Sequence, residues 1–232
     1  MDFDLTQEQQ MIRQAVREFA EKEIAPQARH VDETGEFPAA TFRKMGELGL
    51  MGIPFAEEFG GAGADSLSAA IAVEEVARAC GSTALAYSAH MGLGSAPIAL
   101  FGSPEQKRAF LKPAAEGKYM AAFGLTEPHA GSDAGATRTT ARREGDMWVL
   151  NGAKMWITNA PIAGHIIFTA VTDPEKGKNG ISAIIVPGGT PGMSFGKHEP
   201  KMGLRGSVST AITLFTPGTA RASASARSRT GT

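Results

Sequence analysis

Cysteine is almost absent from this sequence, since Cys80 is the only one among 232 residues. A lone cysteine cannot form an internal disulfide, and its place between Ala79 and Gly81 in a helical pattern is typical of a small buried apolar side chain. We therefore expect a fold without covalent cross-links, which fits a cytoplasmic location.

An excess of charge of either sign is also lacking. The chain has 23 basic and 24 acidic residues, for a formal net charge of -1. Such a balance provides no field for holding nucleic acid or an anionic membrane surface, so neither partner is expected. No apolar run approaches the roughly 20 residues that a membrane-spanning helix needs. The acidic start, residues 1–4, does not have the form of an export signal either.

Several chemical motifs are missing as well. The histidines are scattered, with no pair at i,i+4 spacing and no cysteine cluster, so no metal site is expected: His30, His90, His129, His165 and His198. Residues 92–94 (Gly-Leu-Gly) lie in a helical pattern without the third glycine of a dinucleotide fingerprint. The adjacent acids at 57–58 and 74–75 are typical of helix caps or solvated faces rather than of an acid–base pair. No serine nucleophile elbow is present.

Helical periodicity dominates the first half of the chain, and a 42% hydrophobic content is enough for a real core. Thr6 and Gln9 form a capping box that opens a helix, and Pro26 closes the pattern. Further helices are expected at residues 38–48, 66–79 and 103 to about 117, and the alanine-rich 66–79 helix should be largely buried. Between them, residues 59–63 form a flexible connection, and the pattern of residues 82–100 indicates a helix-turn-helix.

The periodicity changes after Lys118, where short apolar runs alternate with turn signals. We expect strands at residues 120–125, 137–142, 147–150, 153–158, 165–172 and 181–186. Asn151-Gly152 is a strong hairpin signal, because both residues tolerate the positive φ angles of a tight type I′ turn. The sequence therefore predicts an α+β protein: an N-terminal all-helical domain (residues 1–118) followed by an antiparallel β domain (residues 119–216).

The remaining residues, 217–232, have a different composition. From Met202 onward the chain contains no Asp, Glu or Lys, and its last residues are mostly Ala, Ser, Thr and Arg. Such a segment cannot bury enough apolar surface to fold, so we expect disorder after about Pro217. The abrupt change has the form of a shifted reading frame or a truncation.

Two segments of the β region carry groups suited to binding a planar ligand. Residues 124–136 follow an apolar strand and combine Thr126 with glycines that allow a ligand to approach the backbone closely. At residues 156–158, Trp156 offers a flat apolar wall and Thr158 a hydroxyl. The residues alone leave two alternatives open: a ligand site, or an ordinary turn beside a core tryptophan and strand threonines.

Beyond this chemistry, residues 124–136 resemble the signature of the acyl-CoA dehydrogenase family and match every fixed position of it. Three further segments, 59–63, 151–159 and 201–207, resemble family motifs in the same order and at similar separations. The resemblance covers residues 1 to about 207, and short-chain (butyryl-type) members are the most similar. It does not identify the length or branching of the acyl chain.

The resemblance implies an FAD enzyme that oxidises an acyl-CoA thioester to the trans-2-enoyl-CoA. A glutamate removes the α proton, the flavin accepts hydride from the β carbon, and an electron-transferring flavoprotein takes the electrons. In the family the full-length protein is a homotetramer. Because related acyl-CoA oxidases use the same scaffold, they are the enzymatic runner-up.

The same resemblance implies the cofactor-binding residues, which are Phe123, Leu125, Thr126, Gly131, Ser132, Trp156, Ile157 and Thr158. Phe123 stands where the family usually has tyrosine, so a hydroxyl is lost but a ring wall is kept. Gly131 and Ser132 would meet the pyrophosphate, with Ser132 also near the CoA substrate, and Thr158 would bond toward the flavin N5. The segment 90–99 would border the acyl chain.

The C-terminal helical bundle that carries the family's catalytic glutamate is expected to be absent, so no catalytic residue is assigned. This leaves two functional hypotheses from different classes. One is an acyl-CoA dehydrogenase whose activity is impaired or absent in this chain. The other is a catalytically inactive flavin- or CoA-binding fragment or interaction module.

Overall fold

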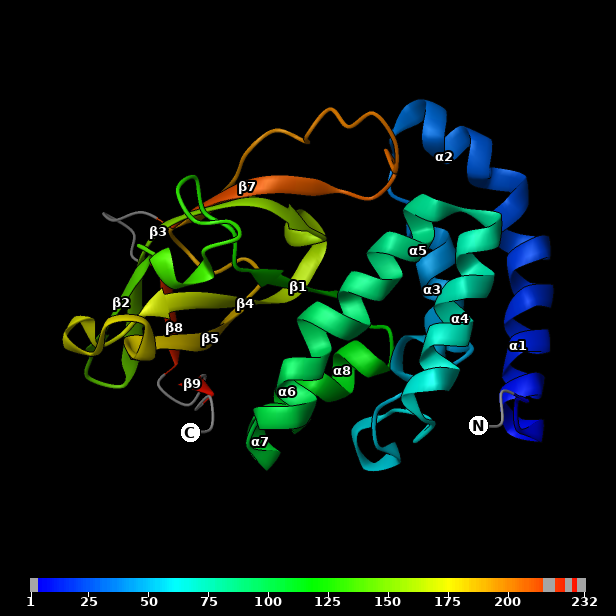
Figure 1. Ribbon diagram of the computed structural model, residues 1–232, viewed down its shortest axis with the longest axis horizontal. Helices are drawn as coiled ribbons and strands as arrows, with labels where there is room; N and C mark the ends of the chain where they lie inside the picture. Colours follow the sequence, from blue (N-terminus) through cyan, green and yellow to red (C-terminus); the bar gives the residue numbers. More distant parts are fainter. Residues whose placement is uncertain (1–3, 215–219, 224–226, 229–232) are drawn as a thin grey trace.

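The computed structural model describes residues 4–214 and the backbone of residues 220–223 and 227–228. Figure 1 shows helices on one side of the molecule and a curled sheet on the other. The change from helices to strands falls between Ala115 and Met120. The predicted order, helices first and sheet second, is confirmed.

The helical half consists of short α, π and 3₁₀ segments. In chain order they are α1 (Gln7–Phe19), η1 (Ala20–Ile24), η2 (Ala25–Gln27), α2 (Ala28–Thr34), α3 (Ala39–Glu47), η3 (Leu50–Gly52), η4 (Glu57–Phe59), α4 (Ser66–Ala79), α5 (Gly81–Ser88), η5 (Ala89–Ser95), α6 (Ala96–Phe101), α7 (Pro104–Gln106), η6 (Lys107–Leu111) and α8 (Lys112–Ala115).

The predicted helix starts are confirmed by their caps. Thr6 and Gln9 form the expected capping box, and Ser103 and Gln106 form a second one. Pro26 does not end the first helical stretch, however. It occupies a first-turn position of η2, where its missing N–H costs no helical hydrogen bond, and the chain continues into α2.

Two helical predictions need correction. Residues 81–101 run without an intervening turn, because the segment with Gly92 and Gly94 widens into the π-helix η5 instead of breaking. The α4 helix has the expected bounds but is buried on one face only. Ile71, Ala72 and Val76 are buried, whereas Leu67 in the first turn is 50% exposed.

The second half contains the strands, separated by three 3₁₀ turns. They are β1 (Met120–Gly124), η7 (Ala134–Ala136), β2 (Thr140–Glu144), β3 (Met147–Thr158), η8 (Ala160–Ile162), β4 (Ala163–Val171), η9 (Pro174–Gly180), β5 (Ile181–Pro187), β6 (Met193–Phe195), β7 (Ser209–Leu214), β8 (Ala220–Ser223) and β9 (Arg227–Ser228).

The sheet is mixed rather than purely antiparallel. Its described strands follow the order β6-β7-β3-β2-β4-β5-β9, while β1 pairs with β4 and β8 with β3. Most pairs are antiparallel, but β1 and β2 both pair with β4 in parallel. β2 and β4 run parallel because the chain reverses between β2 and β3 and again between β3 and β4, while β1 has the same direction as β2.

The predicted hairpin at Asn151-Gly152 is wrong. Both residues lie inside the continuous strand β3, and the chain turns earlier, between Glu144 and Met147. Asn151 pairs with Thr140 of β2, whereas Gly152 pairs with Leu214 of β7. The dipeptide therefore marks the point where β3 passes from one partner strand to another.

The loop between β1 and β2 begins and ends at the same edge of β4. β1 pairs with residues 163–168 of β4 and β2 with Val171, and both lie opposite the β5 side. Residues 125–139 leave this edge and return to it, where Val171 donates a backbone hydrogen bond to Thr139. The motif-bearing loop is thus anchored to the same strand at both ends.

The buried apolar residues of the two halves belong to one hydrophobic cluster. Met45, Met51 and Tyr87 are fully buried in the helical half, and Ile166 and Phe168 are fully buried in the sheet. Within the described residues, we find no helix with both the length and the apolar character needed to cross a membrane.

The disorder predicted after about Pro217 concerns residues that lie largely outside the described ones, and it stays a prediction. Of that segment the structure describes only backbone, as the short strands β8 and β9.

Candidate functional site

A hollow of about 220 Å³ opens where β1, β3 and η5 meet. Six of the eight residues predicted to bind a cofactor line it: Phe123, Leu125, Thr126, Trp156, Ile157 and Thr158. Ala89 and Leu93 of η5 complete the lining. Residues far apart in the chain are thereby brought to one apolar hollow with two hydroxyl groups.

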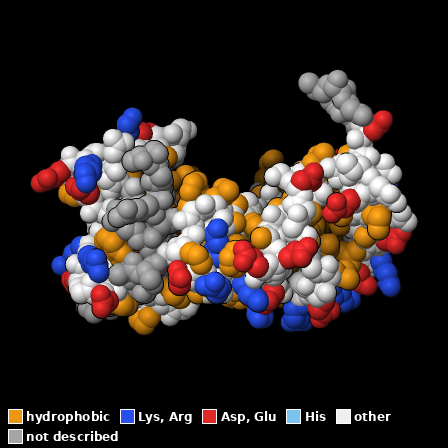
Figure 2. All heavy atoms as spheres, turned by 90° about the horizontal axis from the view of Figure 1, so that it is seen from below, with side chains coloured by type: hydrophobic (Ala, Val, Ile, Leu, Met, Phe, Trp, Pro, Cys, Tyr) orange, Lys and Arg blue, Asp and Glu red, His pale blue; other side chains and the backbone are white. Residues whose placement is uncertain are grey.

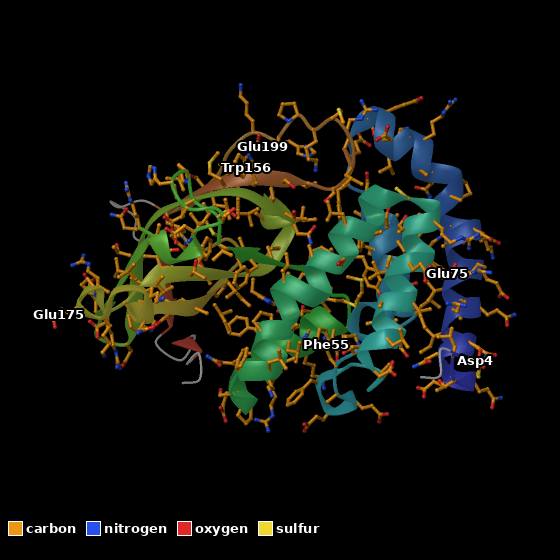
Figure 3. The ribbon with its side chains drawn as sticks, viewed as in Figure 1. Asp4, Phe55, Glu75, Trp156, Glu175 and Glu199 are labelled. Atoms are coloured by element: carbon orange, nitrogen blue, oxygen red, sulfur yellow. The ribbon has the colours of Figure 1, made fainter. Side chains whose placement is uncertain are left out.

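Trp156 forms an exposed wall of this hollow. The pairing of β3 with β7 shifts between Lys154 and Ile157, and at this bulge Trp156 has a φ of 57°. A left-handed backbone is unusual for a bulky residue, and such strain concentrates at functional sites. The side chain is 63% exposed, and Figure 3 shows it beside β7. Trp156 is therefore not the core tryptophan that one interpretation of the sequence allowed.

Contacts with neighbouring segments hold Thr126 and Thr158 in place. Thr158 Oγ1 lies 3.3 Å from Ser209 Oγ on the neighbouring strand β7. The carbonyl oxygen of Thr126 accepts a hydrogen bond of 2.8 Å from the backbone N–H of Met155. The end of β3 and the chain after β1 are thus joined directly beside the hollow.

A buried ion pair lies behind the same two segments. Lys154 Nζ is 2.7 Å from Glu127 Oε1, and both side chains are 2% exposed or less. Burial raises the pKa of Glu127, but the Lys154 ammonium and nearby N–H donors outweigh this and hold the pKa below its ordinary value. Burial also lowers the pKa of Lys154, against the opposing effect of Glu127. Glu127 is a structural anion here, not a free base.

The sequence interpretation missed this pair. The signal for the pair is the alternation of side chains along β3. Lys154 is an even number of residues from the buried Trp148 and Leu150, so its side chain points inward as theirs do. An inward lysine requires an anionic or polar partner. Asn159 was missed as well. It is fully buried, has a φ of 65°, and donates from Nδ2 to the Ala86 carbonyl of α5 at 2.9 Å.

Gly131 and Ser132 are the two predicted cofactor residues that do not line the hollow. They are exposed and follow a tight turn closed by backbone hydrogen bonds between Glu127 and Ala130. A Cβ built on Gly131 would meet no atom within 4 Å. The backbone here is open to an approaching group, and its role toward a cofactor stays a prediction.

The segment predicted to border an acyl chain, residues 90–99, divides between two places. Leu93 reaches the hollow described above, whereas His90 is fully buried and accepts a hydrogen bond at Nδ1 from the backbone N–H of Ala121. Other members line a larger hollow of about 520 Å³ beside α4: Met91, Gly92, Ala96 and Ala99. Seen from below, hydrophobic side chains are exposed in several places along the molecule, with charged side chains between them (Figure 2).

The lining of the first hollow offers groups that can contact a ligand but no acid–base group. None of the side chains that line it carries a carboxylate or an imidazole. In the part of the chain that the structure describes, no three His, Cys, Asp or Glu side chains gather closely enough to hold a metal ion. The lining offers an indole face, a phenyl ring, aliphatic groups and two hydroxyls.

Comparison with known proteins identifies the family of both halves. Residues 6–118 match the acyl-CoA dehydrogenase N-terminal domain, and residues 122–215 match the acyl-CoA dehydrogenase middle domain. A probable acyl-CoA dehydrogenase of Bacillus subtilis is 59% identical over 215 residues, which is 92% of this chain and 57% of the relative.

Solved structures give the same result. Butyryl-CoA dehydrogenase from Megasphaera elsdenii superposes with a TM-score of 0.92 at 38% identity, covering 98% of this chain and 60% of that one. An acyl-CoA dehydrogenase complexed with FAD from Bacillus anthracis has a TM-score of 0.89 at 38% identity, covering 97% and 38%. The chain thus spans little more than half the length of the curated relative. With both domain matches adjacent and in order, it belongs to the acyl-CoA dehydrogenase family.

Proposed function

We propose that this chain binds FAD at the hollow between β1, β3 and η5, and that the protein takes part in oxidising acyl-CoA to trans-2-enoyl-CoA. The observation that carries the proposal is the exposed indole of Trp156, held on a left-handed bulge beside the hydroxyls of Thr126 and Thr158. An exposed aromatic face edged by hydroxyl groups fits a planar ring system with heteroatoms along its edge.

Each part of the lining then has a role. Trp156, Ile157 and Phe123 provide apolar walls for the isoalloxazine, while Thr126 and Thr158 provide donors at its polar edge. The open backbone at Gly131 and the hydroxyl of Ser132 would receive the pyrophosphate, and Ser132 would also lie near the CoA moiety. When bound, FAD supplies the acceptor for the hydride that leaves the acyl chain.

The residues of this chain contribute electrostatics to the reaction. A hydroxyl donor held by a neighbouring strand, as Thr158 is by Ser209, stabilises negative charge that develops on the ligand without reorganising. Leu93 and Ala89 of η5 border the same hollow and would exclude water from the acyl chain. Because the lining contains no carboxylate or imidazole, proton abstraction requires a base from outside the lining.

Electron-transferring flavoprotein is the proposed acceptor and acyl-CoA the proposed substrate, with a homotetramer as the assembly of the full-length protein. These proposals follow from family membership. The alternative enzymatic function, an acyl-CoA oxidase, differs in passing electrons to oxygen. The rate at which the reduced protein consumes oxygen separates the two.

A second candidate function is flavin or CoA binding without turnover. This function is favoured for the chain by itself, because the lining of the hollow contains no base. The two are distinguished by adding butyryl-CoA anaerobically to the FAD-loaded protein. Bleaching of the flavin absorbance supports dehydrogenation, whereas flavin retention without bleaching supports the binding function. If FAD does not bind at all, dehydrogenation and flavin binding both fail, and only CoA binding is left.

Thr158→Val tests the site itself. Replacing the hydroxyl by a methyl group keeps the volume but removes one hydrogen bond, so FAD affinity should fall roughly fivefold, equivalent to about 1 kcal/mol. The reduction potential of the bound flavin should also shift. Calorimetric titration and a redox titration measure the two effects.

The matched control is Thr140→Val, which removes an exposed threonine hydroxyl from β2 outside the hollow. It should leave both values unchanged. Equal FAD affinity and equal potential in the Thr158 variant would place the cofactor elsewhere.

A further inference from the structure

The buried ammonium of Lys154 uses every hydrogen bond that it can donate. Nζ lies 2.7 Å from Glu127 Oε1, 3.0 Å from the Leu125 carbonyl oxygen and 3.0 Å from Thr169 Oγ1. The side chain is 0% exposed. An ammonium group has three donors, and here they link the end of β3 to the chain that follows β1 and to β4.

The Glu127 carboxylate joins the two ends of the loop between β1 and β2, residues 125–139. Its oxygens accept backbone hydrogen bonds from Arg138 at 2.7 Å and from Thr139 at 3.1 Å. The start of the loop at Glu127 and its return to the sheet at Thr139 are therefore tied to one carboxylate. Exposed Gly131 and Ser132 lie within the part of the chain that this carboxylate encloses.

Both charged residues are immediate neighbours of the hollow. Glu127 follows Leu125 and Thr126, which line one wall, and Lys154 precedes the bulge that presents Trp156. The Met155 to Thr126 backbone hydrogen bond lies between the two walls. Neither charged side chain lines the hollow, so any influence on a ligand must pass through the residues beside them.

Stability alone does not account for such a pair. Removing two charges from water is costly, and apolar residues of similar volume often stabilise a core as well or better. Breaking the pair from one side is much worse, because it leaves an uncompensated charge in the interior. Unlike apolar residues, the ion pair fixes the direction of several backbone N–H and C=O groups through its hydrogen bonds.

We propose that the Lys154–Glu127 ion pair is a positioning device for the flavin site: it fixes the separation and register of the two walls of the hollow and shapes the loop that would receive the pyrophosphate. The inference rests on the proposed FAD site and adds residues that do not touch the ligand. Residues behind a binding site that orient those in contact are the usual means of keeping a site preorganised.

The test separates folding from positioning with three variants. Lys154→Met and Glu127→Gln each break the pair from one side, and the double variant Lys154→Met/Glu127→Leu replaces it by apolar groups. Thermal melting of the protein without flavin measures stability. Calorimetric titration with FAD measures affinity, and a redox titration of the bound flavin measures its potential.

For a positioning pair, the single variants should melt at lower temperature than the parent. The double variant should regain part of that loss, because it leaves no uncompensated charge although the N–H groups of Arg138 and Thr139 lose their acceptor. FAD affinity should nevertheless stay reduced by roughly tenfold or more in all three, with a shifted potential in the double variant. A destabilised control, Ile184→Val in β5, is buried in the same sheet outside the hollow and should bind FAD normally once folded.

Two results would overturn the inference. One is a double variant with the parent's FAD affinity and potential. The other is a loss of affinity that merely follows the unfolded fraction, equally in the variants and in the Ile184 control. If the parent protein itself does not bind FAD, the proposed function fails first, which is a distinguishable outcome.

Discussion

Glu75 shows how much a single buried charge contributes to the helical half. It lies on α4 with a side chain 2% exposed, and Arg17 reaches it with two hydrogen bonds of 2.7 and 2.9 Å. Arg78 adds a third at 2.8 Å, and the Nε of Arg13 lies 3.8 Å away. Figure 3 places Glu75 facing α1. The carboxylate thus joins α1 to α4.

Acid should remove this link within a defined pH window. The Arg17 hydrogen bonds, against the opposing effect of burial, lower the pKa of Glu75 from 4.5 to about 2. A lowered pKa means that the contribution is complete above pH 4.5 and is lost as the pH falls toward 2. Because the arginines are about half exposed, we expect the ionised Glu75 carboxylate to contribute about 2 kcal/mol to the free energy of unfolding.

Glu75→Gln should therefore unfold at lower urea concentration than the parent at pH 7, with the difference shrinking below pH 4.5. The control is Glu33→Gln on α2, whose partner Arg29 forms a surface pair with it and whose side chain is 65% exposed. That change should be close to neutral. A Glu75 variant as stable as the parent at pH 7 would contradict the assignment.

At the residue scale, local chemistry singled out Thr126, Trp156 and Thr158, because they combine polar and aromatic groups at the ends of apolar runs. That chemistry left a ligand site and an ordinary turn both open, and the family resemblance decided between them; the structure brings the three residues to one hollow. Lys154 and Glu127 could not be paired, since they are 27 positions apart and their pairing depends on tertiary contacts. The left-handed φ of Trp156 also has no local signal, because bulky residues normally avoid it.

Among the elements, η5 determines how closely the helical half approaches the sheet. It packs directly on β1, and a Cβ built on Gly94 would lie 2.4 Å from the backbone carbon of Ala121. Real side chains do not approach backbone this closely, so the absent side chain at Gly94 sets the spacing between η5 and β1. By contrast, a Cβ added to Gly92, about half a turn earlier, would meet no atom within 4 Å.

These two glycines form a matched pair for mutation. Gly94→Ala should destabilise the protein by about 3 kcal/mol, because η5 and β1 must separate to admit the methyl group. Gly92→Ala should be neutral or stabilising by about 0.5 kcal/mol, since it restricts the unfolded chain without a clash. Urea unfolding of both variants measures the difference. Equal stabilities would show that η5 and β1 have room to move apart.

Element boundaries were predictable where a local cap or turn fixes them. The two capping boxes placed the starts of α1 and α7, and Gly49, with a φ of 71°, follows α3 as a helix stop. The Asn151-Gly152 signal failed because β3 has a partner strand on each side of this dipeptide, and the pairing outweighs the local turn preference. Likewise, η5 stays helical despite two glycines because it packs on β1.

For the molecule as a whole, the contact between the two halves is rich in buried polar groups. Asn159 bonds the Ala86 carbonyl of α5, and His165 Nε2 lies 2.9 Å from the Gly94 carbonyl oxygen. His90 and His165 are both fully buried there. Farther out, Arg205 in the loop after β6 reaches Asp32 of α2 at 2.7 Å, and Figure 1 shows this loop extending to α2.

The two histidines make the contact sensitive to mild acid. Burial lowers the pKa of His90 from 6.5 to about 3 and that of His165 to about 4. Both are neutral in the folded protein at neutral pH, and the nearby His165 adds to the lowering of the pKa of His90. Stability should be complete above pH 6.5 and fall as the unfolded chain gains protons toward pH 4.

A His90→Gln/His165→Gln double variant should lose stability at pH 7 but show a flatter dependence between pH 6.5 and 4. The parent should lose an amount on the order of 3 kcal/mol for each of the two histidines across that window. Urea midpoints measured at half-unit pH intervals test this. The surface variant His30→Gln is the control, because its side chain is 67% exposed. Parallel pH profiles in parent and double variant would exclude the histidines as the cause.

At this scale the sequence predicted the order of the two halves but not how they meet. Periodicity identifies which face of a helix is apolar, yet it does not say which strand that face will cover. Asn159 illustrates the limit, because its amide bridges α5 and β1 across separations of 73 and 38 residues. Such contacts are fixed by the packed structure and leave no local pattern.

The position of Trp156 also gives the protein an internal optical reporter. The chain has two tryptophans, and they occupy opposite environments: Trp156 is 63% exposed at the hollow, while Trp148 is 7% exposed in the sheet. A small soluble quencher will therefore reach one indole and spare the other. Occupancy of the hollow can be followed as protection of the exposed fluorophore, with the buried one serving as a constant reference and no label attached.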